Sequence, residues 1–195
     1  FFIGNGYLVS WCVGHLVELA QADAYGEQYK RWRYEDLPIL PSQWQYVVPK
    51  DKRKQLAVLR ELMKRPDVGT VICATDAGRE GELIFRYLYH YTGCTTPFVR
   101  LWISSLTDKA IREGLRKLED GSKYDNLYLA AKARSESDWL VCINGTQALS
   151  IAAGHGTYSV GRVQTPTLAM VCERYWENRR FTSEAFWQLH IATDG

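Results

Sequence analysis

An acidic loop in the first half of the sequence carries the residues best suited to chemistry. Asp76 follows the β-branched run 70–74 after one further residue, Thr75, and Glu80 lies one helical turn beyond Asp76. An aspartate at the carboxyl end of a parallel strand faces the crevice where α/β folds bind ligands. Carboxylates on such a turn suit Mg²⁺, which takes one or two of them and completes its shell with water and phosphate oxygens. The loop therefore predicts a magnesium site, and Arg79 offers a guanidinium fork for a phosphate.

Two glycines in this loop, Gly78 and Gly81, would let the backbone approach a ligand closely, because glycine has no Cβ. The structural alternative is an ordinary strand-to-helix turn. In that turn Thr75 or Asp76 caps the helix, and the glutamates favour its positive N-terminal end. Spacing alone favours this alternative, so the acidic loop is not specific by itself.

The elements that must position the loop follow an α/β order. Leucines recur at helical spacing over 51–65, which predicts a helix. The run 70–74 predicts a strand, and an apolar helical face follows the acidic loop. Residues 97–103 predict a second buried strand, and Thr107 is expected to be the N-cap of a helix that ends at Leu118.

The second half of the chain is expected to be mainly helical. One long helical pattern covers 124–152, and another covers 165–178, with Thr165 as its start and Pro166 at its first helical position. Residues 183–193 alternate apolar and polar side chains, which predicts a strand.

The N-terminal region has weaker patterns. Residues 6–19 alternate around Gly14 and predict a strand with a turn. Residues 22–50 contain three prolines among aromatic residues without a sustained period, which indicates a long ordered connection. The fold class is therefore an α/β domain, with a partly parallel sheet and flanking helices, followed by a mainly α-helical domain.

Composition excludes several classes of protein. With 46% hydrophobic and 24% charged residues among 195, the chain is globular and not disordered. No apolar run of roughly 18 residues occurs, so no membrane span is predicted. The net charge of +2 argues only weakly for nucleic acid. The first residues show no initiator Met and no signal-peptide pattern, so we expect an excised piece of a larger protein. The five cysteines, which lack paired spacing, predict a reducing, cytoplasmic environment.

Four segments carry a resemblance to a known family. Residues 74–84, ATDAGREGELI, resemble the Toprim signature of type IA DNA topoisomerases. Residues 138–146, DWLVCINGT, are similar to that family's helix motif, and residues 159–168, SVGRVQTPTL, to the most recognisable stretch of its DNA-groove domain. The residues of these segments, together with residues 9–16, VSWCVGHL, are similar to the topoisomerase III branch. The resemblance extends over nearly the whole chain, with the segments in the correct order.

The resemblance implies a specific chemistry. Such enzymes cut one DNA strand by attack of a tyrosine on a phosphodiester, hold the 5′ end covalently, pass another strand and reseal without ATP. By resemblance, Asp76 and Glu80 are catalytic acids and ligands of Mg²⁺. Gly78 stands where the family often has a second aspartate, which weakens the metal site. The family's first-strand glutamate and lysine would precede Phe1, and none of the 12 tyrosines has the Tyr-Pro-Arg-Thr context of the nucleophile. We therefore expect the fragment alone to be inactive.

The resemblance also implies contacts to single-stranded DNA. A glycine-hinged turn that runs into a helix start presents backbone donors and the guanidinium of Arg162 to phosphates, which supports this role physically. The candidate DNA-binding residues are His15, Arg79, Arg134, Trp139, Gln147, Ser159, Val160, Gly161, Arg162, Val163 and Gln164.

Some of these residues have structural alternatives. Trp139 either stacks on a base or is a core tryptophan on an amphipathic helix. His15 either lies near DNA or has a capping role. Arg134, one helical turn before Asp138, either pairs with it or reaches a phosphate. Gln147 stands where relatives usually carry arginine, which weakens a phosphate contact.

The expected organisation has three parts: a Toprim domain without its N-terminal strand at 1–118, part of a helical single-strand groove domain at 119–181, and the start of a β-rich domain at 182–195. We expect a monomer that binds single-stranded DNA and does not contact membranes. One alternative is another Toprim enzyme, a nuclease or primase, which would not share the segments 138–146 and 159–168. Another alternative is a noncatalytic single-stranded DNA-binding module.

Overall fold

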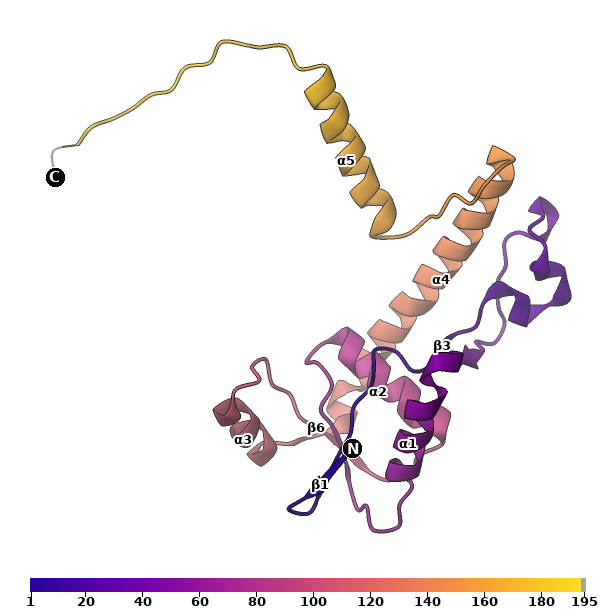
Figure 1. The fold of residues 1–195 in the computed structure, drawn as a ribbon, viewed down its shortest axis with the longest axis vertical. Helices are drawn as coiled ribbons and strands as arrows, with labels where there is room; N and C mark the ends of the chain where they lie inside the picture. The colour runs from indigo at the N-terminus through magenta and orange to yellow at the C-terminus, as the bar shows by residue number, and fades with distance from the viewer. Residues whose placement is uncertain (194–195) are drawn as a thin grey trace.

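The computed structural model describes residues 1–193. A small α/β body holds most of the first half of the chain, and a long helix, α4 (Asp125–Ala153), extends from it (Figure 1). Helix α5 (Gln164–Arg179) follows a connecting turn and lies apart from the body, with all its residues exposed. The expected succession of an α/β part and a helical part is confirmed.

The central sheet has the strand order β5 (Val71–Cys73), β6 (Phe98–Arg100) and β7 (Glu119–Asp120). Strands β5 and β6 are parallel, with Cys73 opposite Arg100 at the end of the ladder, and β7 joins β6 in the antiparallel sense. The two strands expected on either side of the acidic loop's helix are confirmed in shorter form. Strand β7 was not expected, because two residues carry no readable alternation.

Helices α1 (Arg53–Met63) and α2 (Arg79–Thr92) pack their apolar faces together around Cys73 of β5. This core contains Leu16, Leu59, Met63, Cys73, Phe85, Leu88 and Cys94. Helix α2 ends at Gly93, whose φ of 63° lies in the left-handed region and whose N–H donates to the carbonyl of His90 at 3.0 Å. Glycine suits that position because it has no Cβ to clash.

Helix α3 (Asp108–Arg116) begins as the sequence predicts. The hydroxyl of Thr107 accepts a hydrogen bond from the N–H of Ala110 at 3.3 Å, so Thr107 is the N-cap. A short 3₁₀ turn, η5 (Gly121–Tyr124), then leads into α4. No helix among residues 1–193 combines the length and the hydropathy that a membrane crossing requires.

The N-terminal segment forms a hairpin of β1 (Phe2–Gly4) and β2 (Tyr7–Val9). Its turn residues, Asn5 and Gly6, both have positive φ, at 50° and 78°. Turns of this kind match the twist of paired strands. The strand expected over 6–19 is confirmed at β2 and, near its end, at a two-residue strand, β3 (Glu18–Leu19). Between these two strands the chain is irregular.

The connection expected over 22–50 is ordered by three 3₁₀ turns and one strand. They are η1 (Ala22–Tyr25), η2 (Glu27–Lys30), η3 (Tyr34–Asp36) and β4 (Tyr46–Val47), which pairs with β3; a further 3₁₀ turn, η4 (Lys50–Lys52), leads into α1. The side chain of Asn144 on α4 holds this connection, because its Oδ1 accepts from the N–H of Ile39 at 2.6 Å and its Nδ2 donates to the carbonyl of Ile39 at 3.1 Å. The connection is therefore fastened to α4.

Two local predictions in the second half are wrong. Helix α5 begins at Gln164, before Thr165 and Pro166, because the N–H of Thr165 already closes a turn onto the carbonyl of Gly161 at 3.0 Å. The strand predicted over 183–193 does not form, since a strand needs a neighbour for its backbone N–H and C=O groups and this segment pairs with nothing among residues 1–193. The last two residues of the predicted β-rich part lie outside the described residues.

Alkylation of cysteines tests this packing. With iodoacetamide at pH 8, Cys172 on exposed α5 is expected to react first, while Cys73 and Cys94, at 1% and 6% exposure, stay protected. Burial raises the pKa of Cys12 to about 11, so its thiolate fraction and its reactivity are expected to be low. Mass spectrometry after timed quenching measures the order, and labelling in denaturant is the control. Fast labelling of Cys73 in the native protein would contradict the fold.

Candidate functional site

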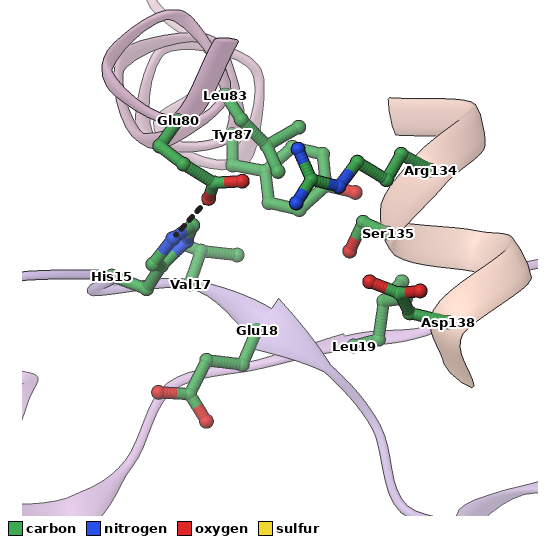
Figure 2. A pocket seen from close by; sticks show the side chains of 10 residues that line it. All are labelled: His15, Val17, Glu18, Leu19, Glu80, Leu83, Tyr87, Arg134, Ser135 and Asp138. Atoms are coloured by element: carbon green, nitrogen blue, oxygen red, sulfur yellow. Dashed lines mark ion pairs between the residues drawn. The ribbon is translucent and has the colours of Figure 1, made fainter. Parts of the chain in front are cut away.

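A cavity of about 280 Å³ lies between the start of α2 and the middle of α4. Figure 2 shows the two helices facing each other across it, with the segment around β3 below. Its lining comes from all three elements: His15, Val17, Glu18 and Leu19, then Glu80, Leu83 and Tyr87, then Arg134, Ser135 and Asp138. The site is thus built where the α/β part meets the helical part.

The lining of the cavity combines the carboxylates of Glu18, Glu80 and Asp138 with the guanidinium of Arg134 and the imidazole of His15. Nε2 of His15 lies 3.3 Å from Oε2 of Glu80, whose side chain is 62% exposed (Figure 2). Glu80 stands in the first turn of α2, where the positive end of the helix dipole favours a carboxylate. Across the cavity, Arg134 reaches in from α4 without an ion-pair partner among residues 1–193. Arg134 is therefore available to an anion, and the pairing with Asp138 that the sequence allowed is not made.

Tyr87 is the one tyrosine in the lining. Its ring is 5% exposed, and burial raises the pKa of its phenol well above the ordinary value. The phenol therefore keeps its proton at neutral pH, which disfavours Tyr87 as a nucleophile.

The acidic loop is held by its backbone. The hydroxyl of Thr75 donates to the carbonyl of Gly81 at 2.7 Å, and Nη2 of Arg100 donates to the carbonyl of Asp76 at 2.6 Å. Asp76, Arg79 and Glu80 all present exposed side chains. The loop therefore has a fixed backbone and free acidic groups.

The two glycines of the loop, Gly78 and Gly81, have different structural roles. A Cβ at Gly81 would collide with the backbone of Asp76, so Gly81 lets the loop close on itself and not on a ligand, which corrects the sequence-based interpretation. A Cβ at Gly78 would meet nothing within 4 Å, and its φ of 176° is extended backbone that any residue adopts. Position 78 therefore has room for a side chain.

The donor set decides whether Mg²⁺ fits. Among residues 1–193 no three His, Cys, Asp or Glu side chains gather as a metal-binding group. The loop offers two exposed carboxylates, Asp76 and Glu80, and Mg²⁺ takes one or two carboxylates with water and phosphate oxygens as its other ligands. Glu80 lines the cavity between α2 and α4, whereas Asp76 lines a separate cavity beside β5 and the N-terminal hairpin. Both are exposed carboxylates of the kind that a water-rich Mg²⁺ site takes, with a phosphate to complete its shell.

The segment 159–164 is fastened to α4 by its backbone. The N–H of Val160 donates to the hydroxyl of Thr146 at 2.9 Å, and Nε of Arg162 donates to both carboxylate oxygens of Asp138 at 2.9 and 3.0 Å. Ser159, Val163 and Gln164 are exposed, while Val160 and Gly161 are half-buried. The structure thus places Arg162 at the rim of the cavity through Asp138, which also lines it.

Two candidate DNA contacts are buried in this structure, which disfavours that role for them. Trp139 is 8% exposed, its Nε1–H donates to the carbonyl of Ala20 at 2.8 Å, and its ring meets Tyr25 and Trp44 edge-on. Gln147 is 4% exposed, so its amide has no access to a phosphate. Both side chains belong to the interior that joins α4 to its neighbours.

Sequence reasoning missed the buried charged residues Glu82, Arg86 and Arg100, which have 0%, 6% and 0% exposure. Each stands within or beside a run of apolar residues, and that was the available signal, since a charge at a core-facing position is buried only when it is paired.

Comparisons with known proteins agree with this division of the site. The family model described as Toprim domain matches residues 2–106, and the one described as DNA topoisomerase matches residues 122–195. The chain is 47% identical to DNA topoisomerase 3 of Shouchella clausii over 190 residues, which is 97% of this chain and 26% of that protein. It is 46% identical to DNA topoisomerase 3 of Bacillus subtilis over 192 residues, again 26% of the relative. The chain thus spans about a quarter of these relatives.

A solved structure is also similar. Full-length topoisomerase I from Thermotoga maritima aligns with a TM-score of 0.62 and 25% identity, over 92% of this chain and 28% of that one.

A substitution at Trp139 separates core packing from base stacking. Trp139→Phe removes the N–H that satisfies the buried carbonyl of Ala20, so we expect the free energy of unfolding to fall by about 1–3 kcal/mol. Single-stranded DNA affinity should not change. Trp176→Phe, on exposed α5, is the control and should leave stability within about 0.5 kcal/mol. Loss of DNA affinity at unchanged stability in Trp139→Phe would restore the stacking role.

Proposed function

We propose that this chain, which belongs to the Toprim family, forms part of the cleavage site of a type IA DNA topoisomerase. Its second part matches the DNA topoisomerase family, and nearly its whole length is similar to DNA topoisomerase 3. The cavity between α2 and α4 carries the proposal. Its walls come from both family segments, with His15 and Glu80 on one side and Arg134 and Asp138 on the other. Cations and carboxylates that face each other across a cleft suit a phosphodiester held beside a metal ion.

The proposed reaction is a pair of transesterifications. The oxygen of a tyrosine hydroxyl loses its proton and bonds to the phosphorus that stays on the 5′ end, while the bond from that phosphorus to the 3′ oxygen breaks and the 3′ oxygen takes a proton. After another strand has passed, the 3′ hydroxyl attacks the phosphotyrosine, the phosphodiester forms again, and the tyrosine leaves and regains its proton, so no ATP is needed. We propose that the nucleophile belongs to another part of the whole protein, because no tyrosine here has the family's context, and that this chain alone is inactive.

In this scheme Asp76 and Glu80 would hold Mg²⁺, which when bound neutralises charge on the attacked phosphate. Glu80 has a second contact, since His15 lies against its carboxylate.

The proposed DNA track runs along two exposed arginines, Arg79 and Arg162, and the half-buried Arg134. Arg79, Arg134 and Arg162, with the backbone of 159–164, are the candidate phosphate contacts. The proposed domains are a Toprim part at 1–118, a groove part at 119–181 and a further segment from 182. We propose that the protein is monomeric and works in a reducing cytoplasm, which the five free cysteines support.

The match over 122–195 disfavours a Toprim nuclease or primase, which would not carry it. Binding of single-stranded DNA without cleavage is the behaviour that we propose for the isolated chain. A relaxation assay of the whole enzyme on supercoiled DNA with Mg²⁺ separates an enzyme from a binding module.

Asp76 tests the metal site. In the whole enzyme, Asp76→Asn should lower Mg²⁺-dependent relaxation and leave the fold intact, because its side chain is exposed. Gly78→Asp is the matched gain, since the added side chain has room, and it should reduce the Mg²⁺ needed for half-maximal rate. Relaxation against Mg²⁺ concentration gives both effects, and thermal melting checks the fold. Wild-type relaxation by Asp76→Asn at low Mg²⁺ would exclude the metal role.

Arg162 tests the DNA track. If its guanidinium contacts a phosphate, Arg162→Ala should weaken single-strand binding by about 1–3 kcal/mol for all sequences, and the salt dependence should flatten by about one phosphate. Arg162→Lys should recover part of the charge but not the bidentate geometry. Fluorescence anisotropy with labelled oligonucleotides at several salt concentrations measures both quantities.

The ion pair with Asp138 supplies the control for this test. Asp138→Asn frees Arg162 without removing it, so a DNA contact predicts equal or tighter binding in that variant. If Arg162 is only a clamp between the turn and α4, both variants should lower the melting temperature and leave the salt slope unchanged. That pattern would reject the DNA role.

A further inference from the structure

We propose that Arg100, paired with buried Glu82, is a positioning residue that holds the acidic loop in the conformation from which Asp76 binds Mg²⁺. This inference rests on the proposed function for the metal. It concerns residues that lie behind the loop and do not touch the cavity.

The guanidinium of Arg100 continues the hydrogen bonding of β5 beyond the end of the β5–β6 ladder. The ladder stops where Cys73 faces Arg100, and β5 then turns into the loop. Nη1 of Arg100 donates to the carbonyls of Cys73 at 2.9 Å and Thr75 at 2.7 Å, and Nη2 donates to the carbonyl of Asp76 at 2.6 Å. The carbonyl of Cys73 also accepts from the N–H of Leu101 at 3.0 Å, so the carbonyls that Arg100 holds beyond the strand pairing are those of Thr75 and Asp76.

Burial makes this contact strong and specific. Arg100 and Glu82 are both 0% exposed, and Nε of Arg100 lies 3.1 Å from Oε2 of Glu82, at an angle that gives an ion pair without a well-aligned hydrogen bond. A buried ion pair is a poor source of stability, because desolvation offsets its attraction. Its value here lies in geometry, since the planar fork fixes the backbone on both sides of Thr75.

The backbone of the acidic loop is too tightly packed to satisfy these carbonyls without the guanidinium of Arg100. Gly81 approaches Asp76 so closely that a Cβ would collide with it, and Thr75 ties its hydroxyl to Gly81. Without the guanidinium of Arg100, the carbonyls of Thr75 and Asp76 lose these hydrogen bonds and turn toward water. The exposed carboxylate of Asp76 then moves with its backbone.

Arg86 provides a matched control, because it pairs with Glu82 as Arg100 does but does not bind the acidic loop. Its Nε donates to Oε1 of Glu82 at 2.9 Å, while its Nη2 donates to the carbonyl of Gly121 at 2.8 Å and to Oδ1 of Asp125 at 2.7 Å. Arg86 therefore fastens the start of α4, and Arg100 fastens the acidic loop, to opposite oxygens of one carboxylate.

The test compares Arg100→Lys with Arg86→Lys in the whole enzyme. Mn²⁺ serves as the probe, and its dissociation constant is measured by electron paramagnetic resonance, with hydrogen exchange of amides 75–82 as a second readout. Arg100→Lys should weaken Mn²⁺ binding about 10-fold, as loss of an outer-shell partner does, and should speed exchange in the loop. Arg86→Lys should lower the melting temperature and leave both readouts unchanged.

Further variants keep the outcomes distinct. If Asp76→Asn weakens Mn²⁺ binding but Arg100→Lys does not, the positioning role is overturned and the metal site stands. If Asp76→Asn binds Mn²⁺ like the wild type, the proposed metal site fails and with it the link from Arg100 to the metal.

A milder variant covers the case in which Arg100→Lys does not fold. Trp102 is exposed, and its ring centre is 5.2 Å from the guanidinium carbon of Arg100. The milder variant is Trp102→Leu, which removes this aromatic ring. That variant should speed loop exchange in the same sense. Unchanged exchange in it would overturn the proposal.

Discussion

Glu82 is the point on which the two halves of the molecule depend. Its carboxylate has no exposure and lies between two guanidinium groups, Arg100 on the side of the acidic loop and Arg86 on the side of α4. Removal of one member of such a buried set leaves an uncompensated charge and costs about 3–5 kcal/mol. The same three side chains therefore set the loop, the helix α2 that carries Glu80, and the start of the helix that carries Arg134 and Asp138.

Because α2 and α4 are tied at this point, the cavity between them has a defined shape. Leu83 and Tyr87 of α2 pack against Ala131 and Tyr128 of α4, and these apolar contacts continue the helix pairing as far as the cavity. The charges that line it are mixed and local. Glu18, Glu80 and Asp138 accompany Arg134 and His15 in this lining, so the cleft holds no concentration of positive charge, in keeping with a net charge of only +2.

The connection before α1 is part of the same construction. Trp139 and Asn144, both on α4, hold the backbone of Ala20 and Ile39, so the segment that brings His15 to Glu80 is fastened to the helix opposite. The segment around β3, α2 and α4 are therefore each fastened to the other two around the site. Helix α5, which is exposed throughout, takes no part in it.

Local signals in the sequence determined much of this protein. The helical periods over 51–65 and 124–152, the Thr107 cap and the acidic turn after a β-branched strand depend on neighbours along the chain, and all are present in the structure. Tertiary structure alone decided that Trp139 is core, that Arg162 pairs with Asp138 and that Arg100 holds the loop of Asp76. It also decided that 183–193 forms no strand among the described residues. These outcomes depend on partners distant in sequence, and a residue's own type and spacing carry no record of which partner the fold brings to it.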